Sequence, residues 1–206
     1  MQICTIRNEV KIPIGKHMGE FVTFHGLVDR KEHLAINFKV QPGKTPLVRM
    51  HSECLTGDVF QSHRCDCGEQ LNEAIDLIAH HGGTLLYLRQ EGRGIGLYNK
   101  IDAYQYQLEG FDTYAANKKL GLENDLRDYT VAAQMLRAMG MNRVKLLTNN
   151  PDKIQQLVDL GIAIEEQLST SVFLKEGNVN YLKAKVDVTS HRLKLDLTQE
   201  ALKCCL

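Results

Sequence analysis

The stretch TLLYLRQEGRGIGLYNKI, residues 84–101, decides the fold class of this 206-residue chain. Its first five residues are an apolar run of strand length, and the glycine-rich loop QEGRGIG (90–96) follows soon after. The helix that comes next carries one apolar face, formed by Leu97, Ile101, Tyr104 and Leu108. A strand that leads through a loop into a helix is typical of α/β folds. The stretch therefore predicts an α/β domain.

Helix and strand patterns also alternate on both sides of this stretch. A helix predicted from about residue 69 to Gly82 has an apolar stripe formed by Leu71, Ala74, Ile75, Ile78 and Ala79. A later helix, closed by Gly140, has a stripe formed by Ala132, Met135, Leu136 and Met139. The elements predicted after it are the strand VKLLT (144–148), a short helix over 153–160 and the strand IAIEEQL (162–168).

The first part of the chain differs, because short β-rich runs alternate there with turn residues. These runs are FVTFHGLV (21–28), LAINFKV (34–40) and LVRMH (47–51). They predict an N-terminal antiparallel sheet over about residues 1–50.

We expect one domain over residues 1–206, built on a mixed sheet with flanking helices and this N-terminal β portion. A further helix is expected after Gly177, through Tyr181 and Val186. Residues from about 190 to 206 are expected to form a flexible tail.

The charge balance limits the expected partners. Lys plus Arg and Asp plus Glu both number 25, so the formal net charge is zero, and neither nucleic acid nor a membrane surface is expected as a partner. No apolar run approaches the roughly 20 residues that span a bilayer, and the start of the chain lacks the apolar core of a signal peptide. We therefore expect a cytoplasmic protein, whose six cysteines are thiols or metal ligands rather than disulfides.

Three of these cysteines, Cys54, Cys65 and Cys67, lie close together in the segment HSECLTGDVFQSHRCDCGEQL. Their thiolates can reach one zinc ion if the residues between them form a turn, and a fourth position left to water gives a hydroxide nucleophile at neutral pH. The spacing leaves two alternatives open. His51 or His63 could complete a structural Cys3His site, and buried cysteines often only pack as small hydrophobic residues.

The loop over residues 89–96 predicts an anion site. Its glycines let the backbone approach a ligand closely, and Arg89 or Arg93 could grip a phosphate. A mobile glycine turn with solvated arginines is an equally common interpretation. The carboxylate of Glu91 does not fit a pure phosphate site, but it could accept hydrogen bonds from a guanine N1–H and 2-amino group, unless it is simply solvated.

Two further groups of polar residues are ambiguous on spacing alone. Asp125 and Asp128 precede a predicted helix, where carboxylates usually act as caps. Thr148 and Lys153 flank an Asn-Asn-Pro turn after a strand, and strand ends of α/β sheets are common ligand sites.

The motifs together resemble the GTP cyclohydrolase II family. The resemblance runs from about Pro46 to Lys153, with the motifs in order and at the expected separations. They are RMHSECLTGDVF (49–60), RCDCGEQL (64–71), RQEGRGIGLYNKI (89–101), GLENDLRDYTVAAQML (121–136) and LLTNNPDK (146–153).

The resemblance implies a defined reaction. GTP would lose C8 as formate and would also lose pyrophosphate, leaving 2,5-diamino-6-hydroxy-4-(5-phosphoribosylamino)pyrimidine, in the first step of riboflavin biosynthesis. It also implies one zinc ion per subunit, Mg²⁺ with the triphosphate, and a homodimer.

The resemblance assigns roles to residues by position. The zinc ligands fall on Cys54, Cys65 and Cys67, in agreement with the spacing argument. The proton acceptor falls on Asp125, the nucleophile on Arg127, and a tyrosine near the opened ring on Tyr104. The implied substrate-binding residues are Arg49, Met50, His51, Ser52, Glu53, Gln70, Glu91, Gly92, Arg93, Thr113, Thr148 and Lys153.

One implied role conflicts with physical chemistry. The guanidinium of Arg127 keeps its proton and is a poor nucleophile, so an electrostatic clamp is an equal alternative. Two rival functions also remain. One is a related enzyme that opens the guanine ring without releasing formate, or that acts on another nucleotide. The other is a zinc-stabilised module that binds nucleic acid without catalysis, although the zero net charge disfavours it.

Overall fold

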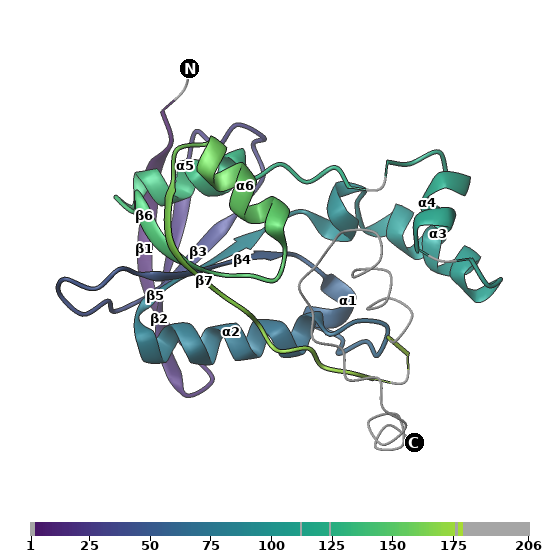
Figure 1. The fold of residues 1–206 in the computed structure, drawn as a ribbon, viewed down its shortest axis with the longest axis horizontal. Coiled ribbons are helices and arrows are strands. Elements are labelled where there is room, and N and C mark those ends of the chain that lie inside the picture. Colours follow the sequence, from purple (N-terminus) through teal and green to yellow (C-terminus); the bar gives the residue numbers. More distant parts are fainter. Residues whose placement is uncertain (1–2, 112, 124, 176, 179–206) are drawn as a thin grey trace. The chain divides into compact units, whose positions relative to one another are not determined.

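The computed structural model describes residues 3–111, 113–123, 125–175, 177 and 178. These residues divide between two compact units (Figure 1). Unit 1 comprises Met1–His51, Asn72–Arg89 and Asp128–Thr170, and unit 2 comprises Ser52–Leu71, Gln90–Arg127 and Ser171–Leu206. The helix and tail expected after Gly177 lie outside the described residues, apart from Asn178.

Unit 1 is built on a seven-stranded mixed sheet with the strand order β1-β2-β3-β5-β4-β6-β7. The strands are β1 (Thr5–Ile14), β2 (His17–His25), β3 (Leu34–Phe38), β4 (Leu47–Ser52), β5 (Gly83–Leu88), β6 (Arg143–Leu147) and β7 (Ala163–Leu168). Pairing is antiparallel from β1 through β2 and β3 to β5, whereas β4, β6 and β7 pair in parallel. The structure confirms the predicted mixed α/β sheet with flanking helices.

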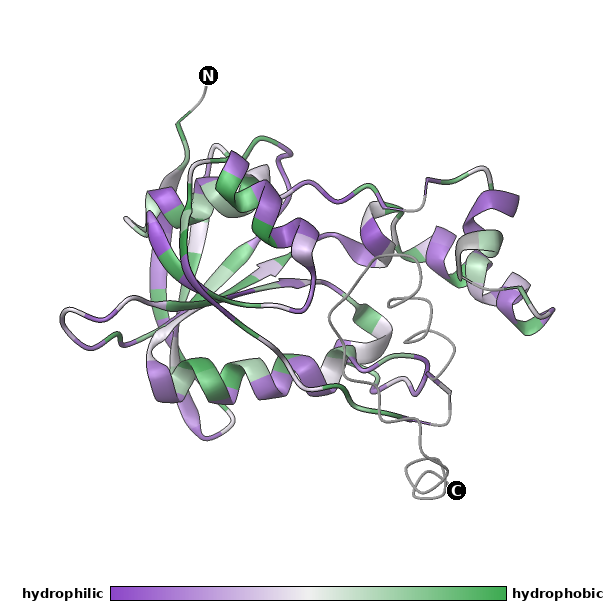
Figure 2. Ribbon diagram, viewed as in Figure 1, coloured by the Kyte–Doolittle hydropathy of each residue, from purple (hydrophilic) through white to green (hydrophobic). Residues whose placement is uncertain are grey.

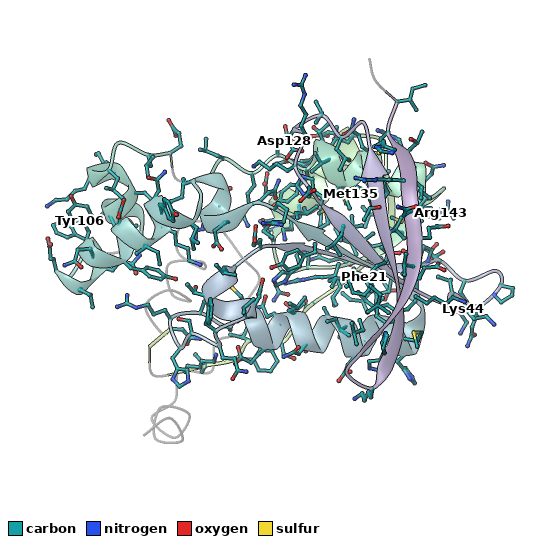
Figure 3. All side chains as sticks on the ribbon, turned by 180° about the vertical axis from the view of Figure 1, so that it is seen from behind. Phe21, Lys44, Tyr106, Asp128, Met135 and Arg143 are labelled. Atoms are coloured by element: carbon teal, nitrogen blue, oxygen red, sulfur yellow. The ribbon has the colours of Figure 1, made fainter. Side chains whose placement is uncertain are left out.

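The predicted N-terminal antiparallel sheet was wrong in one part. The run LVRMH forms β4, which pairs in parallel with β6 rather than antiparallel with β3. An eight-residue connection (residues 39–46) carries the chain past β5 to the far side of that strand. The exposed Lys44 lies on this connection (Figure 3).

The structure adds β1, which the sequence did not predict because most of its side chains are exposed on an edge strand.

Helices cover both faces of the sheet (Figures 1 and 3). Helices α5 (Thr130–Ala138) and α6 (Pro151–Asp159) lie on one face, and α2 (Cys67–His81) lies on the other. Asn150 begins α6 as an N-cap, because its side chain accepts a hydrogen bond from the backbone nitrogen of Asp152 at 2.9 Å. The mixed colours along these helices in Figure 2 match their amphipathic sequences.

The main core of unit 1 lies between the sheet and α5. Side chains alternate along a strand, so Leu86 and Leu88 face one side while Leu85 faces the other. Leu86 and Leu88 join the buried cluster that includes Met135 and Leu136 of α5. Figure 3 labels Met135. The predicted stripe of α5 is therefore confirmed.

The opposite face of the sheet belongs to α2. Ala74 and Ile78 of its predicted stripe are fully buried. On the surface beside them, His17 of β2 hydrogen-bonds to Asp76 at 2.6 Å, which fastens the helix to the sheet. None of the helices in the described part of the chain is long and apolar enough to cross a membrane.

Unit 2 consists of short helices and loops. Its helices are α1 (Leu55–Asp58), the 3-10 helix η1 (Glu91–Gly94), α3 (Leu97–Leu108) and α4 (Thr113–Lys119). The apolar face predicted for α3 was wrong in part. Leu97 and Tyr104 are half-buried, but Ile101 and Leu108 are exposed, and Lys100 and Ala103 are buried instead. The helix turns this side inward because the ammonium of Lys100 has anionic partners within the unit.

Candidate metal centre

Three cysteines of unit 2 form a cluster of sulfur atoms. Cys54 is the N-cap of α1, Cys67 is the first residue of α2, and Cys65 lies in the loop between the two helices. Their sulfur atoms all lie within 4.8 Å of one another, and those of Cys54 and Cys65 are 3.6 Å apart. Zn–S bonds of about 2.3 Å at tetrahedral angles separate sulfur ligands by about 3.8 Å. The cluster therefore fits a zinc ion.

Glycine is required beside this cluster. A Cβ atom added to Gly57 would lie 2.7 Å from the sulfur of Cys65 and 3.2 Å from that of Cys54. A Cβ atom added to Gly68 would lie 2.5 Å from the carbonyl oxygen of Gly57. The two glycines thus let α1 approach the start of α2 closely enough for the sulfur atoms to converge.

The three thiols are not equivalent. The pKa of Cys54 lies far below that of an ordinary thiol, because Cys65, Cys67 and the ammonium of Lys100 all favour its anion. The pKa of Cys65 is raised to about 11, chiefly by its hydrogen bond with Cys54, and that of Cys67 is also raised. Cys54 is therefore the thiolate that is ready to receive a cation, and a bound divalent ion would deprotonate the other two.

Neither of the two histidines considered as a fourth ligand belongs to the group of donor atoms found among the described residues. His51 is buried in unit 1, where its ring stacks on Tyr87 at 5.6 Å. His63 is exposed in unit 2. Within the described residues, the only group of donor atoms able to hold a metal ion is that of the three cysteines.

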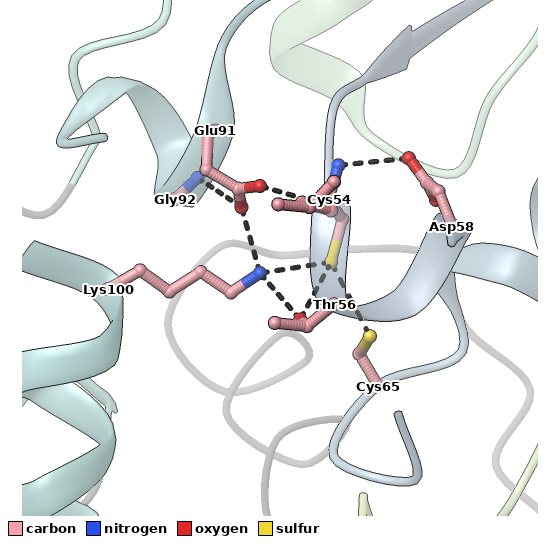
Figure 4. Close-up of polar contacts among 8 residues, drawn as sticks. Cys54, Thr56, Asp58, Cys65, Glu91, Gly92 and Lys100 are labelled. Carbon is pink, nitrogen blue, oxygen red and sulfur yellow. Dashed lines mark hydrogen bonds and ion pairs between the residues drawn. The ribbon is translucent and has the colours of Figure 1, made fainter. Parts of the chain in front are cut away.

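A buried lysine connects the sulfur cluster to the glycine-rich loop (Figure 4). The Nζ atom of Lys100 donates to Cys54 Sγ at 3.2 Å, to Thr56 Oγ1 at 2.9 Å and to Glu91 Oε1 at 2.8 Å. Burial lowers the pKa of Lys100, but the anionic Cys54 leads the groups that together raise it above its usual value. Lys100 is therefore a permanent cation beside the cysteines.

The carboxylate of Glu91 is occupied by donors of the chain itself. Oε2 accepts a hydrogen bond from the backbone nitrogen of Leu55 at 2.6 Å, and Oε1 accepts one from that of Gly92 at 3.0 Å in addition to the ion pair with Lys100. Glu91 thereby ties the glycine-rich loop to the helix that follows Cys54. Its substrate-binding role, and its pairing with guanine, stay predictions.

The glycine-rich loop has an unusual backbone. Gly92, Arg93 and Gly94 all have positive φ angles, of 62°, 60° and 93°. This conformation is costly for Arg93, which has a Cβ atom. The backbone oxygen of Arg93 accepts a hydrogen bond from the nitrogen of Leu126 at 2.9 Å, so the loop is fixed against the segment that carries the implied catalytic residues.

Three of the implied catalytic residues lie in unit 2. The carboxylate of Asp125 pairs with the guanidinium of Arg127. Burial raises the pKa of Asp125, but Arg127 outweighs this effect and holds it below the usual value. Tyr104 on α3 lies under the guanidinium of Arg64, 4.9 Å from the ring centre, and burial raises its pKa.

Asp128, considered above as a cap, belongs to unit 1 and accepts a hydrogen bond from Thr130 at the start of α5.

Other implied residues belong to unit 1, and two of them are joined. Lys153 at the start of α6 donates from Nζ to the carbonyl oxygen of Met50 at 2.6 Å. Arg49 donates to the carbonyl oxygen of Leu147 at 3.2 Å. Thr148 accepts a hydrogen bond from the backbone nitrogen of Asn150. These residues lie at the ends of β4 and β6 and at the start of α6, where parallel strands of α/β sheets often place ligand-binding groups.

The remaining implied substrate-binding residues belong to unit 2. The side-chain amide of Gln70 donates to Asp66 at 2.7 Å. Ser52 lies 3.4 Å from the side-chain oxygen of Gln90. Glu53 is half-buried, and Thr113 begins α4, but its side chain is not among those described.

The sequence reasoning missed Lys100, Thr56 and Gly57. A lysine on a helix is usually solvated, so residue type gave no signal for Lys100. The position of Lys100 did give a signal, because Lys100 and Tyr104 are four residues apart and share one helix face. Placing Tyr104 at the site should have placed Lys100 there too.

Comparisons with known proteins identify the family of the chain. A family model described as GTP cyclohydrolase II matches residues 5–169. The chain is 60% identical to GTP cyclohydrolase-2 of Vibrio cholerae over 178 residues, covering 85% of this chain and 90% of that one. It is 55% identical to GTP cyclohydrolase-2 of Aliivibrio salmonicida over 196 residues, covering 93% and 98%.

A longer relative is also similar. The riboflavin biosynthesis protein RibBA of Bacillus cereus is 48% identical over 194 residues, which cover 92% of this chain and 49% of the relative. The sequence resemblance is thus confirmed over most of the chain, which is an enzyme of the GTP cyclohydrolase II family.

Proposed function

We propose that this enzyme hydrolyses GTP to 2,5-diamino-6-hydroxy-4-(5-phosphoribosylamino)pyrimidine, formate and pyrophosphate, with zinc held by Cys54, Cys65 and Cys67. The observation that carries the proposal is the contact between two sequence motifs. Glu91 of the glycine-rich loop accepts a hydrogen bond from Leu55, which directly follows the ligand Cys54. The loop that we propose binds the nucleotide and the sulfur cluster that we propose binds zinc therefore lie in contact within one compact unit.

Opening the guanine ring needs a strong nucleophile at C8 and groups that move protons. Zinc, when bound, supplies a Lewis acid that activates water at neutral pH. A carboxylate is ionised at neutral pH, and Arg127 lowers the pKa of Asp125 further, so this group is in the form that can accept a proton. A phenol is protonated at neutral pH, and burial raises the pKa of Tyr104 further, so this group holds a proton that it can donate.

Release of pyrophosphate needs neutralisation of the triphosphate charge. We assign this to Mg²⁺ and to the cationic side chains of Arg127 and Lys153. Lys153 is buried and hydrogen-bonded to the carbonyl oxygen of Met50, so its ammonium is held in a fixed position. The other implied substrate-binding residues keep their predicted roles as part of this proposal.

Arg127 is assigned here as an electrostatic clamp. Its guanidinium is paired with Asp125 and stays protonated, which disfavours attack on phosphorus. Rapid quenching of the reaction followed by mass mapping tests the assignment. A phosphoryl group found on Arg127 would establish the nucleophile role instead, and Arg127→Ala is expected to be inactive in either case.

We further propose that the enzyme is a cytoplasmic homodimer of single-domain subunits, each with one zinc ion, and that it does not bind nucleic acid. Light scattering during chromatography would give the mass of the assembly, and metal analysis of the same sample would give the zinc content per subunit. A monomer, or a zinc content far from one per chain, would contradict these statements.

The reaction itself is tested by measuring formate release and product mass in one preparation. We expect GTP-dependent formate together with the deformylated pyrimidine. A product that retains the formyl group would identify the related enzyme that opens the ring only. Bound zinc without turnover of any nucleotide would favour the non-enzymatic module.

A further inference from the structure

Lys100 of α3 has every hydrogen-bond donor of its ammonium engaged inside unit 2. The ammonium offers three N–H groups, and its three acceptors are Cys54 Sγ, Thr56 Oγ1 and Glu91 Oε1, at 3.2, 2.9 and 2.8 Å. Its side chain is 10% exposed, and that of Glu91 is 8% exposed (Figure 4). Lysine and glutamate are rarely buried unless they are paired, so this arrangement has a specific use.

The charges around the sulfur cluster explain why Lys100 and Glu91 are buried as a pair. Three thiolates and one divalent cation carry a net charge of −1, and this charge would lie among buried groups. The ammonium of Lys100 offsets it at 3.2 Å, and its N–H···S bond draws electron density from Cys54. Glu91 in turn balances the lysine and holds it through the bonds to Leu55 and Gly92.

We propose that Lys100 is a positioning residue of the metal centre: it fixes the sulfur of Cys54 in its ligand geometry, tunes its donor strength, and couples the centre to the glycine-rich loop through Glu91. The assignment rests on the proposed zinc site, and it adds a residue beyond the three cysteines that would hold the ion. Hydrogen bonds to metal ligands commonly change metal affinity by about 10–100-fold.

Metal affinity gives the first test. Zinc binding is measured by competition with a metal-binding dye, without nucleotide, on the wild-type chain and on Lys100→Met. The variant keeps the length of the side chain but loses the charge and all three donors. We expect its affinity for zinc to fall by about 10–100-fold. Lys100→Arg keeps a charged N–H donor and is expected to restore most of the affinity.

A spectroscopic test separates an effect on Cys54 from a general loss of packing. In the cobalt-substituted protein, thiolate-to-cobalt charge transfer absorbs in the near ultraviolet, and a hydrogen bond to the sulfur lowers the energy of its lone pairs. Lys100→Met should therefore shift this band to longer wavelength, whereas Lys100→Arg should leave it close to the wild-type position.

Lys119→Met is the matched control. Lys119 is also a lysine on a helix of unit 2, but its ammonium lies over the rings of Phe111 and Tyr106, at 4.1 and 5.3 Å, and not at the sulfur cluster. This variant should keep wild-type zinc affinity and an unshifted band. Circular dichroism checks folding. If Lys100→Met is unfolded, Lys100→Gln is measured with the same expected directions.

Wild-type affinity and an unshifted band in folded Lys100→Met, or in folded Lys100→Gln where the Met variant is unfolded, would overturn the assignment. Its failure is distinct from failure of the proposed function, because neither measurement uses substrate. A wild-type enzyme that binds zinc at the cysteines but releases no formate would overturn only the proposed reaction. A wild-type enzyme that releases formate while Lys100→Met binds metal unchanged would overturn only the role of Lys100.

Discussion

Asp125 Oδ1 accepts two hydrogen bonds from Arg127, one from Nε at 2.8 Å and one from the backbone nitrogen at 3.1 Å. The implied proton acceptor and the implied nucleophile thus hold each other in place. A base needs an ionised carboxylate, and the guanidinium offsets the burial that would otherwise raise the pKa of Asp125.

Removal of the guanidinium should raise the pKa of Asp125. Burial would then act on the carboxylate without its main opposing charge, so Arg127→Ala moves the pKa upward. A carbon NMR titration of the Asp125 carboxyl group measures this without any need for activity. In the wild type, the stabilisation from the lowered pKa is present above the unfolded value of about 3.9 and is lost only as the pH falls below it. An unchanged titration in the variant would contradict the pairing.

Replacement of one metal ligand should remove both the metal and the activity. Cys65→Ser offers a weaker, harder ligand, so we expect loss of zinc and of formate release. Cys4→Ser is the control, because Cys4 belongs to unit 1 and lies outside the sulfur cluster. Metal analysis and a formate assay are run on both variants. Full activity with retained zinc in Cys65→Ser would disprove the metal assignment.

Gly57→Ala should weaken the metal site although it changes no ligand. The added methyl group would lie 2.7 Å from the sulfur of Cys65, so the sulfur atoms must move apart. In an ordinary helix this substitution would be stabilising by about 1 kcal/mol. We therefore expect lower zinc affinity in the dye competition assay. Tighter binding would show that the sulfur atoms do not need the present spacing.

Alanine substitutions at two glycines with similar φ angles separate the effect of backbone strain from the effect of a steric contact. Gly94 and Gly110 have φ angles of 93° and 96°, but a Cβ atom on Gly94 would lie 3.0–3.3 Å from Leu126, whereas one on Gly110 meets no atom within 4 Å. In both alanine variants, the left-handed backbone is expected to lower the free energy of unfolding by about 1–2 kcal/mol. Only Gly94→Ala should also disturb the segment of Asp125 and Arg127 and lower kcat. Equal losses of kcat in the two variants would refute this.

His33 should make the stability of the protein depend on pH. Its Nδ1 accepts a hydrogen bond from the backbone nitrogen of Arg89 at 2.9 Å, and its Nε2 pairs with Asp29 at 2.9 Å. Burial lowers the pKa of His33, more than Asp29 raises it. The folded state therefore binds fewer protons than the unfolded state, and the free energy of unfolding falls as the pH drops below about 6.5.

Urea unfolding at pH 7.5 and pH 5.5 measures the effect. His33→Asn keeps an acceptor near the position of Nδ1 but cannot be protonated, so its free energy of unfolding should change less between the two pH values. An equal change in both proteins would assign the pH dependence to other groups.

The sequence predicted those parts of the fold that have regular local patterns. The stripes of α2 and α5 were found because buried residues recur every three or four positions, and Ala74, Ile78, Met135 and Leu136 are fully buried. The pairing of β4 could not be found this way. Whether β4 pairs with β3 or with β6 depends on where the chain crosses the sheet, which leaves no trace in the pattern of the strand itself.

The candidate site likewise has features that the sequence predicted and features that it did not. The three cysteines lie close in the sequence, and the structure brings their sulfur atoms within 4.8 Å of one another. Lys100 and Cys54 are far apart in the sequence, so only the four-residue spacing between Lys100 and Tyr104 pointed to Lys100, and nothing in the sequence indicated its contact with Cys54. The face of α3 was misjudged for a related reason. Periodicity favours Ile101 and Leu108 as buried residues, whereas the ion pair with Glu91 makes it favourable to bury Lys100.

The short sequence span of the three sulfur ligands has a consequence for biogenesis. Residues 54–67 leave the ribosome well before β6 and β7, which complete the sheet. Closing such a small loop around an ion costs little chain entropy. With zinc as the proposed ion, we expect a nascent chain to capture it before most of the tertiary structure exists, and the yield of folded enzyme to depend on zinc supply during translation.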